Sequence, residues 1–430
     1  MADDDGDGFF LPTDAFVEVL LRLPMSSRRR FRLVSKRWRD LINERTPERL
    51  VRTKILAFFS EAGASHAVVL PDQPQPDGGG RQEWTFPSST SNSNTYTFGY
   101  IRRIRDAGVV HLVGTCNGLL CLRDDVPNPG GGGTLSTISV TNPVTGEKAA
   151  ILRGPISWGS YGIQSRKVVK YGFGYHPTTG KYKVVVVSCL PASTCFTKRL
   201  EIDMVMVLTV GRPEKPDSGW REVPGLAGPD SGYHDSGDVI VTVDGTAYWL
   251  TGRANRVAAL DLGSDDERFA SFEAPPCLKV LQVPEKATCQ LTSVHGRLGM
   301  LVTRQQPAAA RTDVWVLEGG GGGGRRQPRW SRRWSGLLDP GGDDGLGRWI
   351  TAPHFTNGEY VLSKREDTRI CETWLYRRKV GDLANGSGKN AELWPLEGAE
   401  EIIHREFFYG GVATFPYVET MEPLPISTTE

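Results

Sequence analysis

The sequence predicts a multidomain protein, in which a small three-helix module precedes an all-β propeller of about six or seven blades. Helical periodicity is confined to roughly the first 50 residues. Beyond them one unit recurs, a two-residue turn ending in glycine followed by an apolar strand. Asn-Gly and Asp-Gly are strong signals of such hairpin turns, because the type I′ turn needs positive φ at both central residues. The glycines of this unit lie 62, 65, 51 and 62 residues apart, at Gly118, Gly180, Gly245, Gly296 and Gly358. Units of this length that hold about four strands are typical of propeller blades.

The N-terminal module is predicted from the spacing of its apolar residues. Pro12 suits the first turn of a helix, where a missing N–H costs nothing. From Pro12 to Leu23 the polar residues Asp14, Glu18 and Arg22 are four apart. They therefore form one narrow stripe on an otherwise apolar helix, and the helix is predicted to end at Pro24. A second apolar set at helical spacing follows, with basic residues around it: Phe31, Val34, Trp38 and Leu41. Since about 40 residues rarely build a stable core alone, we expect a docking module whose apolar faces need a partner.

Residues 9–42 resemble the F-box, the helical motif that binds the Skp-type adaptor of Skp–cullin–F-box ubiquitin ligases. The resemblance rests on Leu11-Pro12, Asp14, the block from Glu18 to Pro24, Ser27, Arg30-Phe31-Arg32 and the run from Val34 to Arg39. It implies adaptor contacts through Leu11, Pro12, Val19, Leu20, Leu23, Phe31, Val34 and Trp38.

The sequence departs from the F-box pattern at one place. Arg28 and Arg29 stand where plant members usually carry apolar residues. The sequence leaves open whether these arginines weaken adaptor binding. The alternative interpretation of the module is an amphipathic helical hairpin that caps the next domain.

The repeat predicts further strands in every unit. A second element follows each glycine turn, at 138–143, 202–210, 256–262, 312–317 and 372–378, and aromatic strands follow at Trp220, 269–272, Trp334 and Trp394. An irregular first blade is expected from 56–59, 66–70 and 83–86, and residues 400–418 are expected to pair with it and close the ring. Glycine-, proline- or charge-rich stretches are expected to be surface insertions, at 71–95, 130–133, 216–235 and 319–333. Two stacked β-sandwiches are the alternative arrangement.

Phrases between residues 110 and 424 resemble the plant F-box-associated domain. They are GTCNGLLCL with ISVTNPVTGE (114–147), YGFGYHPTTGKYKVV (171–185), VDGTAYWLT through ERFASFEAPP (243–276), LTSVHGRLGML with DVWVLE (291–318) and FPYVETMEPL (415–424). The resemblance implies a kelch-like propeller that captures a substrate protein for ubiquitination, without identifying it. The expected domains are a disordered acidic tail at 1–8, an F-box at 9–48 and the propeller at 50–425.

Composition excludes several classes of function. Lysine and arginine number 51 against 50 acids, so no overall charge favours nucleic acid or a membrane surface. No apolar run approaches the ~18 residues that span a bilayer, and the N-terminus lacks the order of a signal peptide. Seven cysteines without a CxxC pair are typical of reduced thiols. We therefore expect a location in the cytoplasm, the nucleus or both.

No set of residues in the sequence predicts a catalytic, metal-binding or cofactor-binding site. The acids of residues 3–14 match the spacing of a calcium loop, but no helix can precede them and Pro12 interrupts them. The basic residues between Arg28 and Arg39 fit the solvent-exposed face of a docking helix better than a nucleic-acid-binding site. We expect a non-catalytic substrate-recognition subunit, with an adaptor, through it cullin, and an unidentified substrate protein as partners. The alternatives are a propeller that binds proteins outside any ligase and a propeller enzyme.

Overall fold

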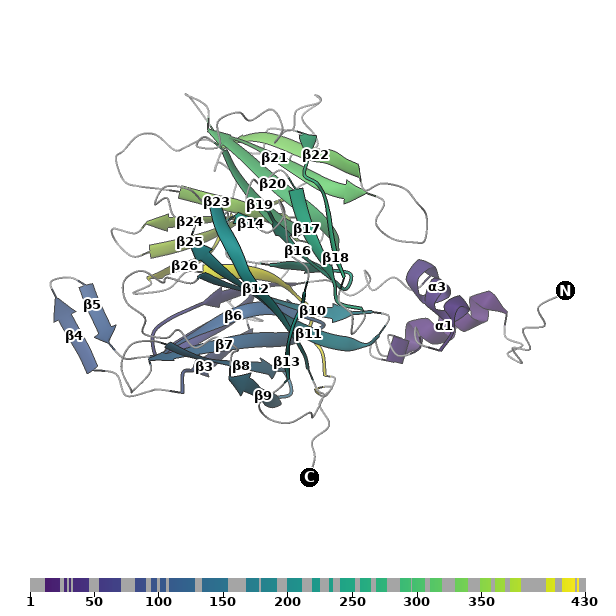
Figure 1. The fold of residues 1–430 in the computed structure, drawn as a ribbon, viewed down its shortest axis with the longest axis horizontal. Coiled ribbons are helices and arrows are strands. Elements are labelled where there is room, and N and C mark those ends of the chain that lie inside the picture. Colours follow the sequence, from purple (N-terminus) through teal and green to yellow (C-terminus); the bar gives the residue numbers. More distant parts are fainter. Residues whose placement is uncertain are drawn as a thin grey trace.

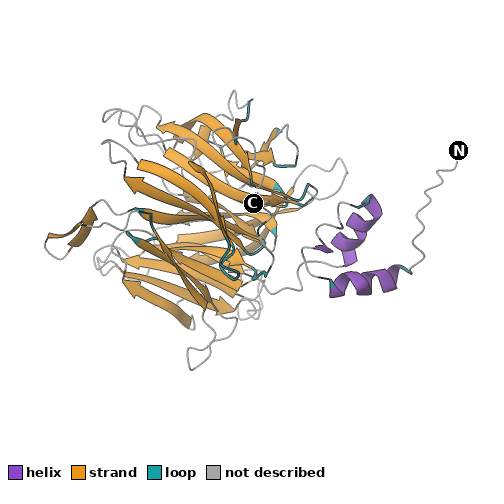
Figure 2. Cartoon of the chain, turned by 90° about the horizontal axis from the view of Figure 1, so that it is seen from below, coloured by secondary structure: helices purple, strands orange, loops and turns teal. Residues whose placement is uncertain are grey.

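The computed structural model describes the following residues: 12–23, 27–28, 31, 34–45, 54–70, 82–89, 94–98, 101–105, 108–127, 134–153, 168–177, 179–191, 199–210, 219–224, 232–234, 240–251, 256–263, 268–276, 287–294, 296–305, 310–318, 329–338, 349–356, 360–367, 372–379, 400–406, 412–421 and 424. Two helices with defined bounds, α1 (Thr13–Arg22) and α3 (Lys36–Arg45), precede the strands. Helical backbone also occurs between them, at residues 27, 28 and 31. In two perpendicular views the helices stand outside the β-sheets (Figures 1 and 2).

Most strands belong to six antiparallel sheets. The first contains β27 (Val412–Tyr417), β1 (Lys54–Phe59), β2 (Ala64–Leu70) and β3 (Gln82–Pro87). The second contains β6 (Val109–Cys116), β7 (Leu119–Pro127), β8 (Thr134–Thr141) and β9 (Lys148–Arg153). The third contains β10 (Val168–His176), β11 (Lys181–Pro191), β12 (Arg199–Thr209) and β13 (Trp220–Glu222), with β14 (Gly232–His234) also paired to β12.

The remaining strands continue the same order. The fourth sheet contains β15 (Val241–Val243), β16 (Thr246–Leu250), β17 (Arg256–Asp261) and β18 (Phe269–Glu273). The fifth contains β19 (Ala287–Val294), β20 (Arg297–Gln305), β21 (Ala310–Glu318) and β22 (Arg329–Leu338), and the sixth contains β23 (Trp349–Thr356), β24 (Tyr360–Asp367), β25 (Glu372–Lys379) and β26 (Glu400–Glu406). A separate hairpin, β4 (Asn94–Phe98) with β5 (Ile101–Arg105), projects from the sheets (Figure 1).

The glycine turns form hairpins for the predicted reason. Asn117 and Gly118 both have positive φ (53° and 83°), as do Asp244 and Gly245 (48° and 76°). Positive φ at both central residues is the requirement of the type I′ turn, which favours Asn-Gly and Asp-Gly. At Gly180 the prediction of a two-residue turn was wrong. His176 pairs with Lys181, so the loop has four residues, closed by a hydrogen bond from the Gly180 N–H to the His176 carbonyl (2.9 Å). The predicted turn at 357–358 lies outside the described residues.

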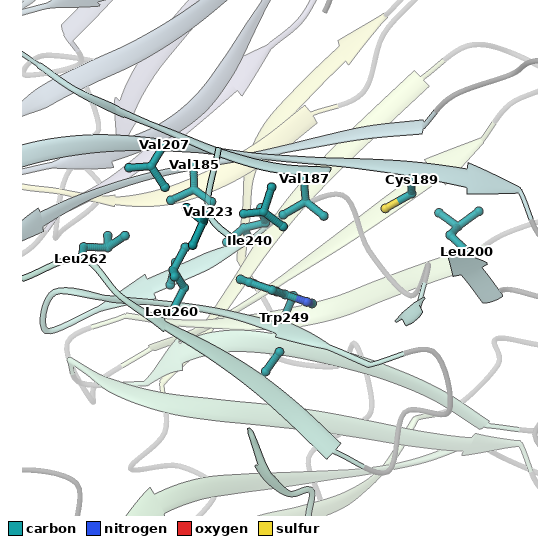
Figure 3. Close-up of a cluster of buried hydrophobic side chains, with 13 residues drawn as sticks. Val185, Val187, Cys189, Leu200, Val207, Val223, Ile240, Trp249, Leu260 and Leu262 are labelled. Atoms are coloured by element: carbon teal, nitrogen blue, oxygen red, sulfur yellow. The ribbon is translucent and has the colours of Figure 1, made fainter. Parts of the chain in front are cut away.

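Apolar clusters between successive sheets hold the ring together. Figure 3 shows one of them, where β11 and β12 of the third sheet meet the fourth sheet. Trp249, 1% exposed, lies there against Val187 and Leu260, which are fully buried. Other clusters join the first sheet to the second, the second to the third, and the fourth to the fifth, and the strands β19 and β23 contact each other. The first four sheets therefore bury both faces against their neighbours, which a four-stranded sheet cannot do alone.

The two ends of the β-region meet in one sheet, as predicted. β27 pairs antiparallel with β1 from Lys54–Tyr417 to Phe59–Val412. Leu375 of the sixth sheet packs with Val412 and the first sheet, which completes the circle. The second predicted tail strand, β26, instead pairs with β25 as the outer strand of the sixth sheet.

The predicted insertions contain more strand than expected. The stretch 216–235 holds β14 besides the predicted strand at Trp220, the stretch 71–95 holds the start of β4 besides the predicted strand at 83–86, and residues 329–333 belong to β22. These short or charged strands lack the apolar runs on which the prediction depended. The rest of these stretches, and the whole of 130–133, lie outside the described residues.

Candidate functional site

The helical module buries a small core of its own. Phe16 and Leu20 of α1 pack with Ile42 of α3, at 7%, 0% and 1% exposure. Trp38 lies edge-on to Phe16, with ring centroids 4.5 Å apart, and to Phe31 at 5.2 Å. This corrects the expectation that the helices cannot bury their own apolar faces. Two helices of ten residues can still form a core when aromatic rings fill the space between them.

The ends of both helices have local causes. α1 begins after Pro12, whose carbonyl accepts a hydrogen bond from the Phe16 N–H (3.0 Å), and it ends one residue before Leu23. α3 begins after Ser35, whose hydroxyl accepts a hydrogen bond from the Trp38 N–H (3.2 Å). A serine at this position satisfies one of the backbone donors that a helix start leaves unpaired. The apolar set predicted to share helical spacing is therefore interrupted at Ser35.

Apolar side chains remain exposed on this module. Val19 is 48% exposed and Val34 is 60% exposed. Among the described residues, only one other large apolar side chain is classed as exposed, Met421 near the C-terminus. Pro12 is exposed as well, and the polar stripe of Asp14, Glu18 and Arg22 faces solvent as predicted. Val19 and Val34 therefore form an apolar surface of the module that a partner protein could cover.

The eight predicted adaptor residues separate into three groups. Pro12, Val19 and Val34 are exposed, while Leu23, Phe31 and Trp38 are half-buried against the helical core. Leu20 is fully buried, so its position is that of a core residue and not of a contact surface. Leu11 lies outside the described residues.

Arg28, one of the two arginines that depart from the F-box pattern, is only partly exposed. Its Nε atom is buried and has no hydrogen-bond partner among the described residues. Its guanidinium therefore lies partly against the module, although Arg29 is outside the described range.

The helical core contains residues of the module alone. No propeller side chain contributes to the cluster around Leu20, and the helices stand apart from the sheets in both views (Figures 1 and 2). In the described part of the chain, the exposed valines are therefore not covered by the propeller.

A polar cluster that contains serine, histidine and aspartate lies on the second sheet of the propeller. The Asp125 carboxylate accepts a hydrogen bond from the Ser136 hydroxyl (2.6 Å), forms an ion pair with Arg123 (2.8 Å) and lies 3.6 Å from His111 Nε2. Arg123 also lies over the ring of Tyr171, 4.7 Å from its centroid. Serine and histidine both approach the carboxylate rather than each other. This arrangement does not form a nucleophile–base pair.

The described residues hold no group of three or more histidine, cysteine, aspartate or glutamate residues placed to bind a metal ion. No described helix is both long enough and apolar enough to cross a membrane. Cys121 is fully buried, which raises the pKa of its thiol far above the ordinary value. A thiol in that environment is a packing residue.

Comparisons with known proteins agree with this architecture. Residues 10–49 match the F-box domain, and residues 75–336 match the F-box associated beta propeller domain. An F-box/kelch-repeat protein of Arabidopsis thaliana is 24% identical, covering 98% of this chain and 85% of its own length. An F-box protein of the same plant is 25% identical, covering 96% and 93%. A polysaccharide lyase structure covers 78% of this chain and 75% of its own, at 9% identity and a TM-score of 0.31, which is too low to support an argument. The chain belongs to the family of proteins with an F-box associated beta propeller domain, which here follows an N-terminal F-box.

Proposed function

We propose that the chain is the substrate-recognition subunit of a Skp–cullin–F-box ubiquitin ligase. The helical module binds the Skp-type adaptor, and through it cullin, while a kelch-like ring of six blades holds a target protein. The observation that carries this proposal is the pair of exposed valines, Val19 and Val34, on a module that packs on itself. Its match to the F-box domain supports the choice of partner.

The proposed mechanism is tethering. A target held by the propeller is kept near the ubiquitin-loaded conjugating enzyme, which raises its effective concentration there. The chain itself transfers no chemical group in this proposal. The site of action is the cytoplasm, the nucleus or both.

The proposed adaptor surface is Pro12, Val19 and Val34, with the exposed parts of Leu23, Phe31 and Trp38. Burying a whole valine side chain stabilises a complex by about 1.5–3 kcal/mol. Because Val19 and Val34 are roughly half exposed before binding, each can supply about 1 kcal/mol. A charge at both positions would remove this contribution and add the cost of desolvating a carboxylate.

The test is co-purification of a Skp-type adaptor with the full chain. The double variant Val19→Asp, Val34→Asp should lose at least tenfold in adaptor affinity while keeping its far-UV circular dichroism. Met421→Asp is the matched control, since it places the same charge on the exposed apolar residue outside the module. It should bind the adaptor like the wild type.

Leu20→Ala provides the opposite comparison in the same helix. It removes a fully buried side chain, so it should destabilise the module by about 2–5 kcal/mol. Its adaptor binding should fall only as far as the helices unfold. A wild-type chain that is folded but recovers no adaptor would contradict the proposal and favour a propeller that binds proteins outside a ligase. In that case Arg28→Leu with Arg29→Leu would test whether the arginines prevent binding.

A further inference from the structure

Positive charge is concentrated on one sheet of the propeller. Strands β20, β21 and β22 carry six arginines and two acids, whereas the neighbouring strands β15–β18 carry one arginine and two acids. The whole chain has a net charge of only +1. A local excess of this size on a near-neutral protein creates a directed field that attracts anionic groups. The six arginines are Arg297, Arg304, Arg311, Arg329, Arg332 and Arg333.

Both acids of this sheet are already engaged by arginines. Asp313, 2% exposed, lies 3.4 Å from Arg304 and 4.0 Å from Arg332. Glu318 pairs with Arg333 and accepts a hydrogen bond from the Ser331 hydroxyl (2.8 Å). The hydrogen bond from Ser331, together with the nearby arginines, holds the pKa of Glu318 below its usual value.

Other arginines of this sheet remain outside these ion pairs. Arg297 and Arg329 are exposed and influence Glu318 electrostatically. Within the described part of the chain neither has an acid of its own at ion-pair distance. Arg333 occupies a bulge in the pairing of β21 with β22, because Val314 pairs with Trp334 and Trp315 with Arg332. Bulges of this kind redirect a side chain and are common beside binding sites.

Arg329 and Arg333 stand on the edge strand β22, while Arg297 lies two strands inward on β20. β22 pairs with β21, and no other described strand pairs with its second edge. Trp330 anchors it, because the side chain is 9% exposed and its Nε1–H donates to the Glu273 carbonyl of the fourth sheet (2.9 Å). An open strand edge can accept an extended peptide as an additional strand. Arg329 and Arg333 would then lie beside the side chains of that peptide, and Arg297 would add to the positive field of the sheet.

We propose that the β22 edge, with Arg329 and Arg333 and with the added charge of Arg297 on β20, is a docking surface for an acidic, extended segment of a partner protein. This deepens the proposed function, on which it rests, by giving the class of target that the propeller holds. A peptide is favoured over nucleic acid because Trp330 and Trp315 pack into the core between the fourth and fifth sheets. They do not offer the exposed aromatic surface on which single-stranded bases stack.

The experiment measures binding of a fluorescent deca-glutamate peptide to the full chain by anisotropy, at two salt concentrations. Binding should weaken as salt rises, because exposed charges are screened. The variant Arg297→Glu, Arg329→Glu should bind the peptide roughly tenfold more weakly. The matched control Lys148→Glu, Arg268→Glu reverses two exposed cations on other sheets and should bind like the wild type.

Three results would overturn the inference. They are no peptide binding by the wild type, equal weakening by both double variants, and tighter binding of a ten-nucleotide oligo-dT probe that the Arg297→Glu, Arg329→Glu variant loses. Adaptor co-purification is measured on the same samples and should be unchanged in both variants. A chain that recovers adaptor but ignores the peptide refutes the docking surface alone, and one that binds peptide without adaptor refutes the ligase role.

Discussion

Gly118 lies under the C-terminal segment, and replacing it with alanine should loosen the closure of the ring. At φ 83° an L-residue is strained by about 1–2 kcal/mol. A Cβ at this position would also lie 2.6 Å from the Val418 carbonyl oxygen and collide with Thr420. Because part of this contact is backbone, the segment after β27 must move. Overpacking of this kind costs about 1–3 kcal/mol more.

The C-terminal segment has several contacts to lose. Asn142, fully buried, donates from Nδ2 to the Thr420 carbonyl (3.1 Å), and Glu147 accepts a hydrogen bond from the Leu424 N–H (2.8 Å). Gly118→Ala should therefore lower the free energy of unfolding by about 2–5 kcal/mol, as the sum of strain and displacement. It should also expose the residues after Tyr417 to proteolysis.

Gly296→Ala is the matched control. Gly296 also has positive φ (70°) in a two-residue hairpin turn, but nothing lies within 4 Å of a Cβ built there. It should cost only the strain of about 1–2 kcal/mol. Urea unfolding followed by tryptophan fluorescence measures both variants. Equal losses of stability, or an unchanged rate of C-terminal cleavage in Gly118→Ala, would refute the argument that the segment clamps the turn.

Two further predictions concern titrating groups. Cys121 should resist alkylation in the native protein while half-exposed Cys116 reacts, since burial raises the Cys121 pKa, and peptide mapping by mass spectrometry would reveal the opposite order. Burial lowers the pKa of His176 below its ordinary 6.5, although Asp261 lies 3.7 Å away and opposes the shift. The unfolded chain then binds the proton more readily, so this contribution to stability is complete above about pH 6.5 and declines as pH falls through the lowered pKa. The urea midpoint of His176→Gln should depend less on pH below that value than that of the wild type, and parallel pH curves would contradict the assignment.

Much of the propeller could be predicted because its signals are local. An Asn-Gly or Asp-Gly turn specifies positive φ within two residues, and the strand after Gly118 or Gly245 must pair with the strand before it. Pairing of the tail with the first blade followed from the need to close a ring. Local signals failed where pairing depends on distant strands. β14 has only three residues and pairs with β12. The composition of so short a strand does not predict its partner.

The structural positions of charged residues were harder to predict from the sequence than those of apolar residues. Residues 329–333 were expected in a glycine-rich loop because three of the five are arginines. They form a strand because Trp330 is buried against the neighbouring sheet, which fixes the arginines beside it. Arg297 was not singled out at all, since it influences Glu318 electrostatically only when β20 and β21 stand side by side. The only available signal was the excess of arginine over acid along these three strands.

The helical module shows why a motif does not by itself identify a binding surface. Val19 and Leu20 are neighbours in one apolar run, and the F-box resemblance implied the same role for both. The position of α3 separates them, because Ile42 and Trp38 cover Leu20 and leave Val19 half exposed. A partner can gain hydrophobic energy only from area that the module has not already buried. Adaptor affinity should therefore depend on Val19 and Val34, and the stability of the module on Phe16 and Leu20, even though Val19 stands in the same apolar run as Phe16 and Leu20.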